Sequence, residues 1–134
     1  MATIRREVLI NARPDTVWSA VADFGALHTR LAPGFVTEVK LEDGARVVTF
    51  GNGMVAREVL VSSDDADRRL VWSIVGGPLT HHNGVAQVFA EGPERSRFVW
   101  TTDILPDAMA PSITAMVDQA MPIIKKTLER AEQH

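Results

Sequence analysis

Few residue types in this sequence can do acid–base or nucleophilic chemistry, because its 134 residues include neither cysteine nor tyrosine. Cysteine nucleophiles, thiolate metal sites, disulfides and phenolic acids are therefore excluded. The main remaining candidates are Glu58 and His82 as an acid/base pair, with Arg46 as an anchor for a polar group. Burial of a carboxyl group such as Glu58 raises its pKa toward the range that suits proton transfer. A structural ion pair between Arg46 and Glu58 is the alternative interpretation.

The direction of Glu58 depends on the hairpin turn at residues 51–53, which read Gly-Asn-Gly. A three-residue turn places Arg46 directly opposite Glu58. The apolar residues that share this face are Val48, Ala56 and Leu60. The Asn-Gly pair locally favours a two-residue type I′ turn, which places Arg46 opposite Val59 and turns Glu58 to the other face. The residues alone leave both registers open.

Histidines offer a second kind of chemistry, since they can shuttle a proton or hydrogen-bond to a ligand carbonyl. His81 and His82 are adjacent, and neighbours in a strand point to opposite faces. Counting back from the inward positions Ala86 and Val88 selects His82 as the inward residue, whereas an irregularity near Gly84 reverses that order. An ordinary exposed polar residue is the alternative for each of them.

The histidines do not predict a metal centre. His28 lies among the short helical segments, far in sequence from the adjacent pair His81 and His82, and this spacing does not match a zinc site. The sequence also contains no GxSxG, P-loop or dinucleotide-binding motif. We therefore predict no metal and no cofactor.

The elements that position these residues begin with a strand and two short helices. Alternation predicts the strand over residues 3–10. Pro14 suits the first position of a short helix with an apolar face, and a second short helical segment is expected over residues 26–31. Pro33-Gly34 then forces a turn.

Between residues 35 and 105 the pattern changes to short alternating runs separated by turn residues. These runs predict strands over residues 35–41, 46–50, 54–62, 70–75, 80–90 and 98–105. Short turns between consecutive strands are typical of an antiparallel meander. With the first strand included, the predicted sheet has seven strands.

An amphipathic helix is predicted over residues 107–131. Apolar residues recur in it at steps of three and four: Met109, Ile113, Met116, Val117, Ala120, Met121, Ile124, Leu128 and Ala131. A sheet with one buried face needs a cover, so the expected architecture is α+β, a curved sheet wrapped around this helix. Pro122 removes one helical hydrogen bond, and we expect a bend there that lifts part of the helix from the sheet.

Composition places the chain among ordinary globular proteins and predicts a single domain over residues 1–134. Its 14 basic and 17 acidic residues give a net charge of −3 spread along the chain, which makes no electrostatic case for nucleic acid. The sequence shows neither a signal peptide nor an apolar run long enough for membrane insertion. We expect a cytoplasmic protein.

The order strand, two short helices, six strands and long helix resembles the helix-grip fold of the SRPBCC (START-related) superfamily, in particular its polyketide cyclase/dehydrase subgroup. Matching motifs are VWSAVADFGAL at residues 17–27, RVVTFGNG at 46–53, RRLVWSIVGGPL at 68–79 and FVWTTDI at 98–104. Relatives carry an Arg and a Glu that point into a cavity at the positions of Arg46 and Glu58, so the resemblance favours the three-residue turn. Many also have a tyrosine where Gly84 stands, and its loss is expected to enlarge the cavity. Many relatives have an aromatic-His-Pro step where residues 29–33 read Thr-Arg-Leu-Ala-Pro. Any ligand contact that this aromatic side chain makes in relatives is therefore not expected here.

The resemblance implies a cavity between the sheet and the long helix. Inward residues of the sheet assigned to it are Leu70, Trp72, Ile74, Ala86, Val88, Phe98, Trp100 and Ile104, and those of the helix are Met109, Ile113, Met116, Val117, Ala120 and Met121. The expected ligand-binding set combines Arg46, Glu58, His81 and His82 with all of these residues except Leu70, Ile74, Ile104 and Met109. A filled core is the alternative for each apolar residue.

These observations predict a protein that binds a small hydrophobic molecule, lipid-like or polyketide-like, with a few oxygens. A polyketide cyclase or dehydratase with Glu58 and His82 as acid/base is the alternative. A third possibility is a protein partner that docks at the mouth of the cavity.

Overall fold

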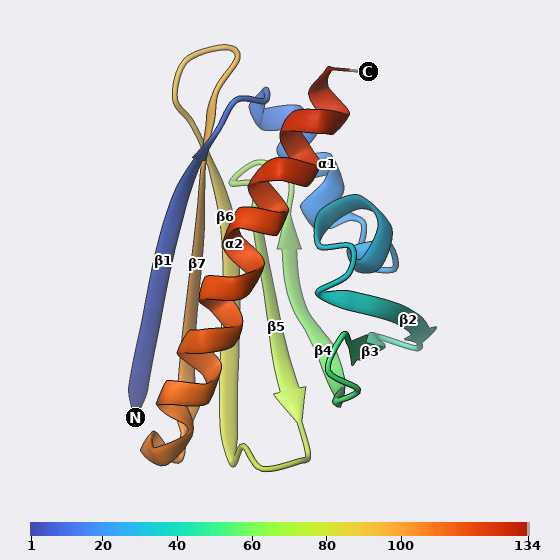
Figure 1. Cartoon of the computed structure of the whole chain (residues 1–134), viewed down its shortest axis with the longest axis vertical. Helices are drawn as coiled ribbons and strands as arrows, with labels where there is room; N and C mark the ends of the chain where they lie inside the picture. Colours follow the sequence, from blue (N-terminus) through green and yellow to red (C-terminus); the bar gives the residue numbers. More distant parts are fainter. Residues whose placement is uncertain (134) are drawn as a thin grey trace.

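A seven-stranded antiparallel sheet and one long helix make up the computed structural model, which describes residues 1–133 (Figure 1). The strands are β1 (Ala2–Ile10), β2 (Val36–Glu42), β3 (Ala45–Phe50), β4 (Val55–Asp64), β5 (Arg69–Val75), β6 (His81–Ala90) and β7 (Ser96–Leu105), in the spatial order β1-β7-β6-β5-β4-β3-β2. The helical elements are α1 (Pro14–Ala22), the π-helical turn η1 (Leu27–Leu31), the 3-10 turn η2 (Asp107–Met109) and α2 (Ala110–Glu132). The predicted α+β helix-grip architecture is confirmed.

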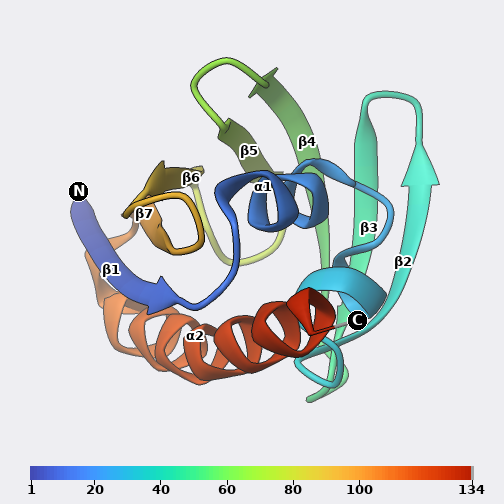
Figure 2. The same cartoon turned by 90° about the horizontal axis from the view of Figure 1, so that it is seen from above.

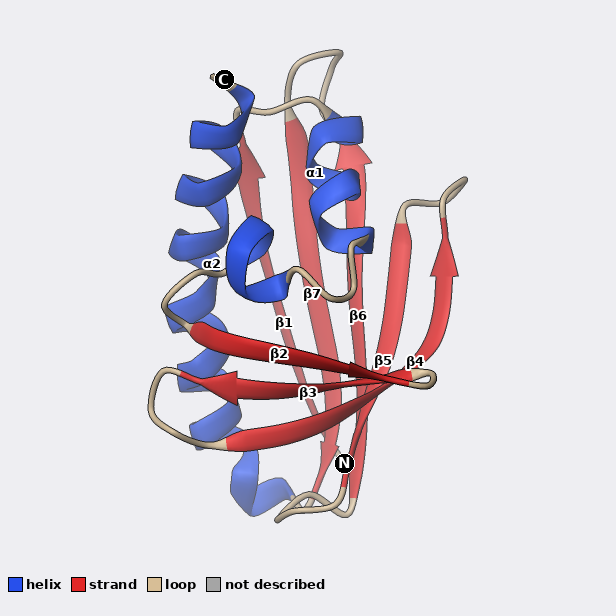
Figure 3. Ribbon diagram, turned by 90° about the vertical axis from the view of Figure 1, so that its right-hand side faces the viewer, coloured by secondary structure: helices blue, strands red, loops and turns tan. Residues whose placement is uncertain are grey.

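The sheet is strongly twisted and curved. Strands β2 and β3 run across the direction of β1, β7 and β6 (Figure 3). Seen from above, the sheet curls around its concave side, which α2 and α1 close (Figure 2). The strand register shifts between Leu60 and Ser62 in β4 and between Val36 and Glu38 in β2, and irregularities of this kind increase the local twist.

Helix α2 covers the concave face with the apolar stripe that its sequence predicts. Its buried residues are Val117, Ala120, Met121, Ile124 and Leu128. The helix continues through Pro122, whose side chain is exposed, without interruption from Ala110 to Glu132. Within residues 1–133, no helix has both the length and the apolar character required to cross a membrane.

The two short helical elements close one end of the curled sheet. Pro14 occupies the first turn of α1, where its missing N–H costs nothing, and the turn holds Val17 and Trp18 against the core. In η1 the amide of Ala32 donates to the carbonyl of Leu27 at 2.8 Å, which closes a wide π-type turn.

Candidate functional site

Arg46 and Glu58 form an ion pair inside the protein. They are directly opposite each other in the β3–β4 ladder, because the turn has three residues and Phe50 pairs with Met54. Arg46 Nε and Nη2 each lie 2.9 Å from Glu58 Oε1. Only 4% of Arg46 and 5% of Glu58 is exposed, so both charges are removed from water. The structure therefore adopts the register that places Glu58 on the concave face.

The Arg46 guanidinium is held from three directions. Its Nη1 donates to the carbonyl oxygen of Phe24 at 3.1 Å. Its Cζ lies 4.0 Å from the centre of the Phe24 ring and 5.9 Å from the Trp72 ring, within reach of cation–π attraction. These contacts fix the position of the positive charge at the wall of the cavity.

The electrostatics of this pair are dominated by burial. Burial raises the pKa of Glu58 above its ordinary value, and the attraction and hydrogen bond of Arg46 offset this only in part. Burial likewise lowers the pKa of Arg46, opposed by Glu58, but a guanidinium keeps its proton in proteins. Glu58 is therefore a more basic carboxylate than an exposed one.

His82 faces the concave side, and His81 is exposed on the other side. The β6–β7 register is unbroken from His81 to Ala90, so the alternation along β6 holds through Gly84. The β5–β6 ladder, in contrast, extends only from Arg69 to Trp72 on the β5 side. Beyond that point the backbone N–H of Ile74 donates to His82 Nδ1 at 3.0 Å, which replaces the missing ladder bond.

The second ring nitrogen of His82 is also occupied. His82 Nε2 lies 3.1 Å from the hydroxyl of Thr102. Burial, followed by the nearby His81, lowers the pKa of His82 to about 4, so the ring is neutral near pH 7. With both nitrogens engaged inside the fold, His82 has no free atom for acid–base work on a ligand.

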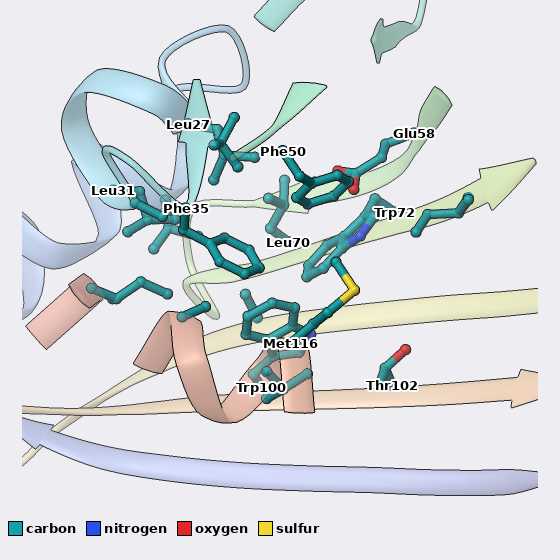
Figure 4. A pocket seen from close by; sticks show the side chains of 18 of the residues that line it. Leu27, Leu31, Phe35, Phe50, Glu58, Leu70, Trp72, Trp100, Thr102 and Met116 are labelled. Atoms are coloured by element: carbon teal, nitrogen blue, oxygen red, sulfur yellow. The ribbon is translucent and has the colours of Figure 1, made fainter. Parts of the chain in front are cut away.

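Trp72 occupies the space beside Gly84. A β-carbon at residue 84 would come within 2.6 Å of Trp72 Cε2 and 2.7 Å of its Cζ2. The expectation that Gly84 enlarges the cavity is therefore wrong, because the indole ring of Trp72 fills the room. Trp72 also packs against Trp100, with ring centres 6.0 Å apart, and the two rings form one wall (Figure 4).

A cavity of about 90 Å³ lies between α2 and the sheet. Its lining is mainly apolar, and its polar members are few: Arg46, Glu58, His82 and Thr102. Expected residues that line it are Arg46, Glu58, Leu70, Trp72, Ile74, His82, Ala86, Phe98, Trp100, Ile113, Met116, Val117 and Ala120. Side chains from β3 to β7 and from α2 therefore meet in one place.

Several expected residues do not line this cavity. His81 is exposed on the opposite face of β6, so it is not part of the cavity lining. Val88, Ile104 and Met121 are buried, but in the packed core beside the cavity. Met109 also lies outside the lining, and Leu60, placed on the inner face, is 37% exposed where β4 leaves the core.

Other lining residues were not foreseen. They are Val21, Leu27, Leu31, Ala32, Phe35, Val36, Phe50, Thr102 and Ile124. Thr102 lies two residues after Trp100 and four after Phe98, so all three share one face of the strand. This spacing predicts Thr102 as an inward residue even though it is polar. Leu27 and Leu31 are four residues apart and therefore lie on the same face of a helical turn. This spacing could have predicted that both leucines line one end of the cavity.

A second hollow of about 300 Å³ lies outside the cavity, between the β3–β4 turn and α2. It shares three walls with the cavity, the side chains of Phe35, Phe50 and Met116. The two phenylalanine rings pack edge to face with centres 5.5 Å apart. These three side chains therefore border both the cavity and the outer hollow.

The fold and this cavity define a START-like protein of the SRPBCC superfamily, a ligand-binding fold. The sequence profile of the family described as polyketide cyclase / dehydrase and lipid transport matches residues 1–132. The chain belongs to that family. A comparison with curated protein sequences gives no significant match.

Three solved structures illustrate the likeness. A Thermobifida fusca protein solved by NMR is 28% identical, with a TM-score of 0.79, over 96% of this chain and 91% of that one. A START superfamily protein from Mycobacterium smegmatis is 14% identical, with a TM-score of 0.73, over 98% and 97%. The Zhui aromatase/cyclase of a Streptomyces species is 18% identical, with a TM-score of 0.73, over 98% and 93%. The last two show the shared fold alone.

Proposed function

We propose that this protein binds a small hydrophobic molecule that carries a few oxygen atoms, in the cavity between α2 and the sheet. The observation that carries the proposal is an apolar buried space with an ion pair, Arg46–Glu58, set into its wall. Protein interiors are normally packed with few voids larger than a water molecule, so a space of about 90 Å³ departs from an ordinary core. Ligand sites combine such apolar walls with a few fixed polar groups.

The cavity, of about 90 Å³, is smaller than most ligand sites, which measure roughly 300–1,000 Å³. The outer hollow supplies the missing room, since Phe35, Phe50 and Met116 line both spaces. Met116 has a flexible, unbranched side chain that changes rotamer at low cost. Binding therefore joins the two spaces by moving these side chains, and a lipid or polyketide of moderate length extends from the cavity into the outer hollow.

Titration of the protein with decanoic acid and with 2-acetylnaphthalene tests this proposal. Trp72 and Trp100 line the cavity, so their fluorescence and the melting temperature both report occupancy. The Ala120→Leu variant fills the cavity from α2, where Ala120 is fully buried, and we expect at least a ten-fold loss of affinity. Ala131→Leu makes the same change at an exposed position near the C-terminal end of α2, outside the cavity lining, and keeps native affinity. Equal binding by all three proteins, or by none, contradicts the proposal.

A catalytic role is a second proposal, supported by Glu58. Its carboxylate lines the cavity, and burial raises its pKa, which makes it a stronger base toward an acidic carbon between two carbonyl groups. In this version Glu58 acts without His82, whose nitrogens are both engaged. Cyclisation of a poly-β-keto thioester by the native protein, and its loss in Glu58→Gln, are the expected results. Equal turnover by both proteins contradicts this role.

A further inference from the structure

Trp100 presents a buried hydrogen-bond donor that has no acceptor. Its Nε1 is shielded from solvent and has no hydrogen-bond partner within residues 1–133. The side chain lines the cavity beside Thr102, two residues further along β7. Residues at this spacing share one face of a strand and lie about 7 Å apart. Both residues therefore belong to the β7 side of the cavity lining, and Figure 4 shows Thr102 further along the strand than the Trp100 ring.

The hydroxyl of Thr102 is a second free donor, because His82 fixes its direction. The amide of Ile74 donates to His82 Nδ1, so that nitrogen carries no proton and the ring proton resides on Nε2. His82 Nε2–H then donates to Thr102 Oγ1 at 3.1 Å. The threonine oxygen is used as an acceptor, and its own O–H is left to donate. In the described chain, Thr102 Oγ1 has no other hydrogen-bond partner.

Donors without acceptors are uncommon in protein interiors, because a buried polar group that loses water and gains no partner is costly. Two of them on one strand, both in the lining of one cavity, indicate a complementary group that supplies acceptors and no donors. Carbonyl oxygens of ketones, esters and quinones have this property, and hydrocarbons lack it.

We propose that the bound molecule places a carbonyl-type acceptor oxygen at Trp100 Nε1 and Thr102 Oγ1, and that this pair selects carbonyl compounds over hydrocarbons of the same shape. The inference rests on the proposed ligand-binding function. It adds the chemical class of the group that the β7 side of the cavity recognises, on the wall made by Trp100 rather than at the Arg46–Glu58 pair.

Cyclohexanone and methylenecyclohexane are suitable probes, because they share one skeleton and differ only in a C=O or C=CH₂ group. The native protein is titrated with each, and its ¹⁵N–¹H spectrum is recorded. The three tryptophans give three indole signals, and Trp18, whose Nε1 donates to Asp65 at 2.8 Å, provides an internal reference. Neither probe has an aromatic ring, so a downfield shift of the Trp100 N–H reports hydrogen bonding.

We expect the ketone to bind roughly five-fold more tightly than the hydrocarbon, the size of one or two hydrogen bonds, and to shift the Trp100 signal alone. Trp100→Phe and Thr102→Val each reduce this preference to about two-fold or less, where the preference is the ratio of the two affinities measured on the same variant. Thr102→Ser keeps a hydroxyl on the same backbone and retains the preference.

The results separate this inference from the function on which it rests. Equal affinity for the two probes with an unmoved Trp100 signal overturns the carbonyl inference and leaves cavity binding intact. Binding of neither probe overturns the carbonyl inference, and the proposed function is overturned as well only if decanoic acid and 2-acetylnaphthalene also fail to bind. The comparison of probes on the native protein needs no variant, so poor folding of Thr102→Val does not affect the decision.

Discussion

The indole ring of Trp72 lies against the backbone of Gly84 so closely that a β-carbon at residue 84 would meet Trp72 Cε2 at 2.6 Å. Gly84 pairs with Trp72 across one ladder and with Thr102 across the other. The glycine therefore sets the position of the ring, and through the ring it sets the width of the cavity.

Gly84→Ala is expected to destabilise the protein by about 1–3 kcal/mol, because the added methyl group overpacks the site and pushes Trp72 toward the cavity. Urea denaturation at pH 7 measures the free energy of unfolding. The double variant Gly84→Ala/Trp72→Leu removes the clashing ring, so its cost is expected to be less than the sum of the two single costs. Additive costs would show that the two residues do not press on each other.

Replacing one member of the buried Arg46–Glu58 pair is expected to lower the free energy of unfolding far more than replacing both members. Glu58→Leu leaves a buried guanidinium without its carboxylate and is expected to cost about 3–5 kcal/mol of unfolding free energy. Arg46→Met/Glu58→Leu removes both charges and is expected to restore most of that loss.

The surface pair Arg57–Glu42, with both side chains nearly half exposed, provides the matched control. Glu42→Leu is expected to cost less than about 1 kcal/mol. Denaturant titrations of all four proteins give the comparison. A loss of similar size for Glu42→Leu and Glu58→Leu would contradict the role of burial.

His82 is expected to make stability depend on pH in the acidic range. Its pKa in the folded protein is lowered to about 4, from an ordinary value of 6.5, so below pH 6.5 the unfolded chain binds a proton that the folded protein refuses. Stability from this group is complete above pH 6.5 and is lost as the pH falls toward 4. The full difference amounts to roughly 3 kcal/mol.

Comparison of His82→Gln with His81→Gln isolates this effect, since His81 is exposed on the other face of the same strand. Between pH 7 and pH 4 the native protein and His81→Gln are expected to lose unfolding free energy in parallel. His82→Gln is expected to lose about 3 kcal/mol less over that range. Identical slopes for all three proteins would show that His82 does not resist protonation.

The inward face of the sheet was readable from the sequence because alternation is a local property. Trp72, His82 and Trp100 were all assigned to the concave side, and all three line the cavity. The position of a residue along that face is not local. Val88 in β6 and Met121 in the facing helix α2 are also buried, yet both pack in the core beside the cavity. The shape of the enclosed space depends on how α2 crosses the sheet.

Residues that close the cavity come from segments too short for their spacing to show which space they line. Phe35 precedes β2 and Leu31 ends η1, and only the tertiary fold brings them over the open end of the sheet. The space at Gly84 was misjudged for a related reason. A glycine at position 84 does not reveal from the sequence whether a neighbouring side chain fills the space beside it, and in the structure the ring of Trp72 does so.

Met116 is expected to control the rate at which a ligand enters, because its side chain is a wall shared by the cavity and the outer hollow. Met116→Ala removes that wall and is expected to raise the association rate constant for 2-acetylnaphthalene by roughly ten-fold, since less rearrangement precedes binding. Stopped-flow tryptophan fluorescence measures the rate. Met109→Ala makes the same truncation in η2, outside the cavity lining, and is expected to bind at the native rate. Unchanged association in Met116→Ala would place the entrance elsewhere on the protein.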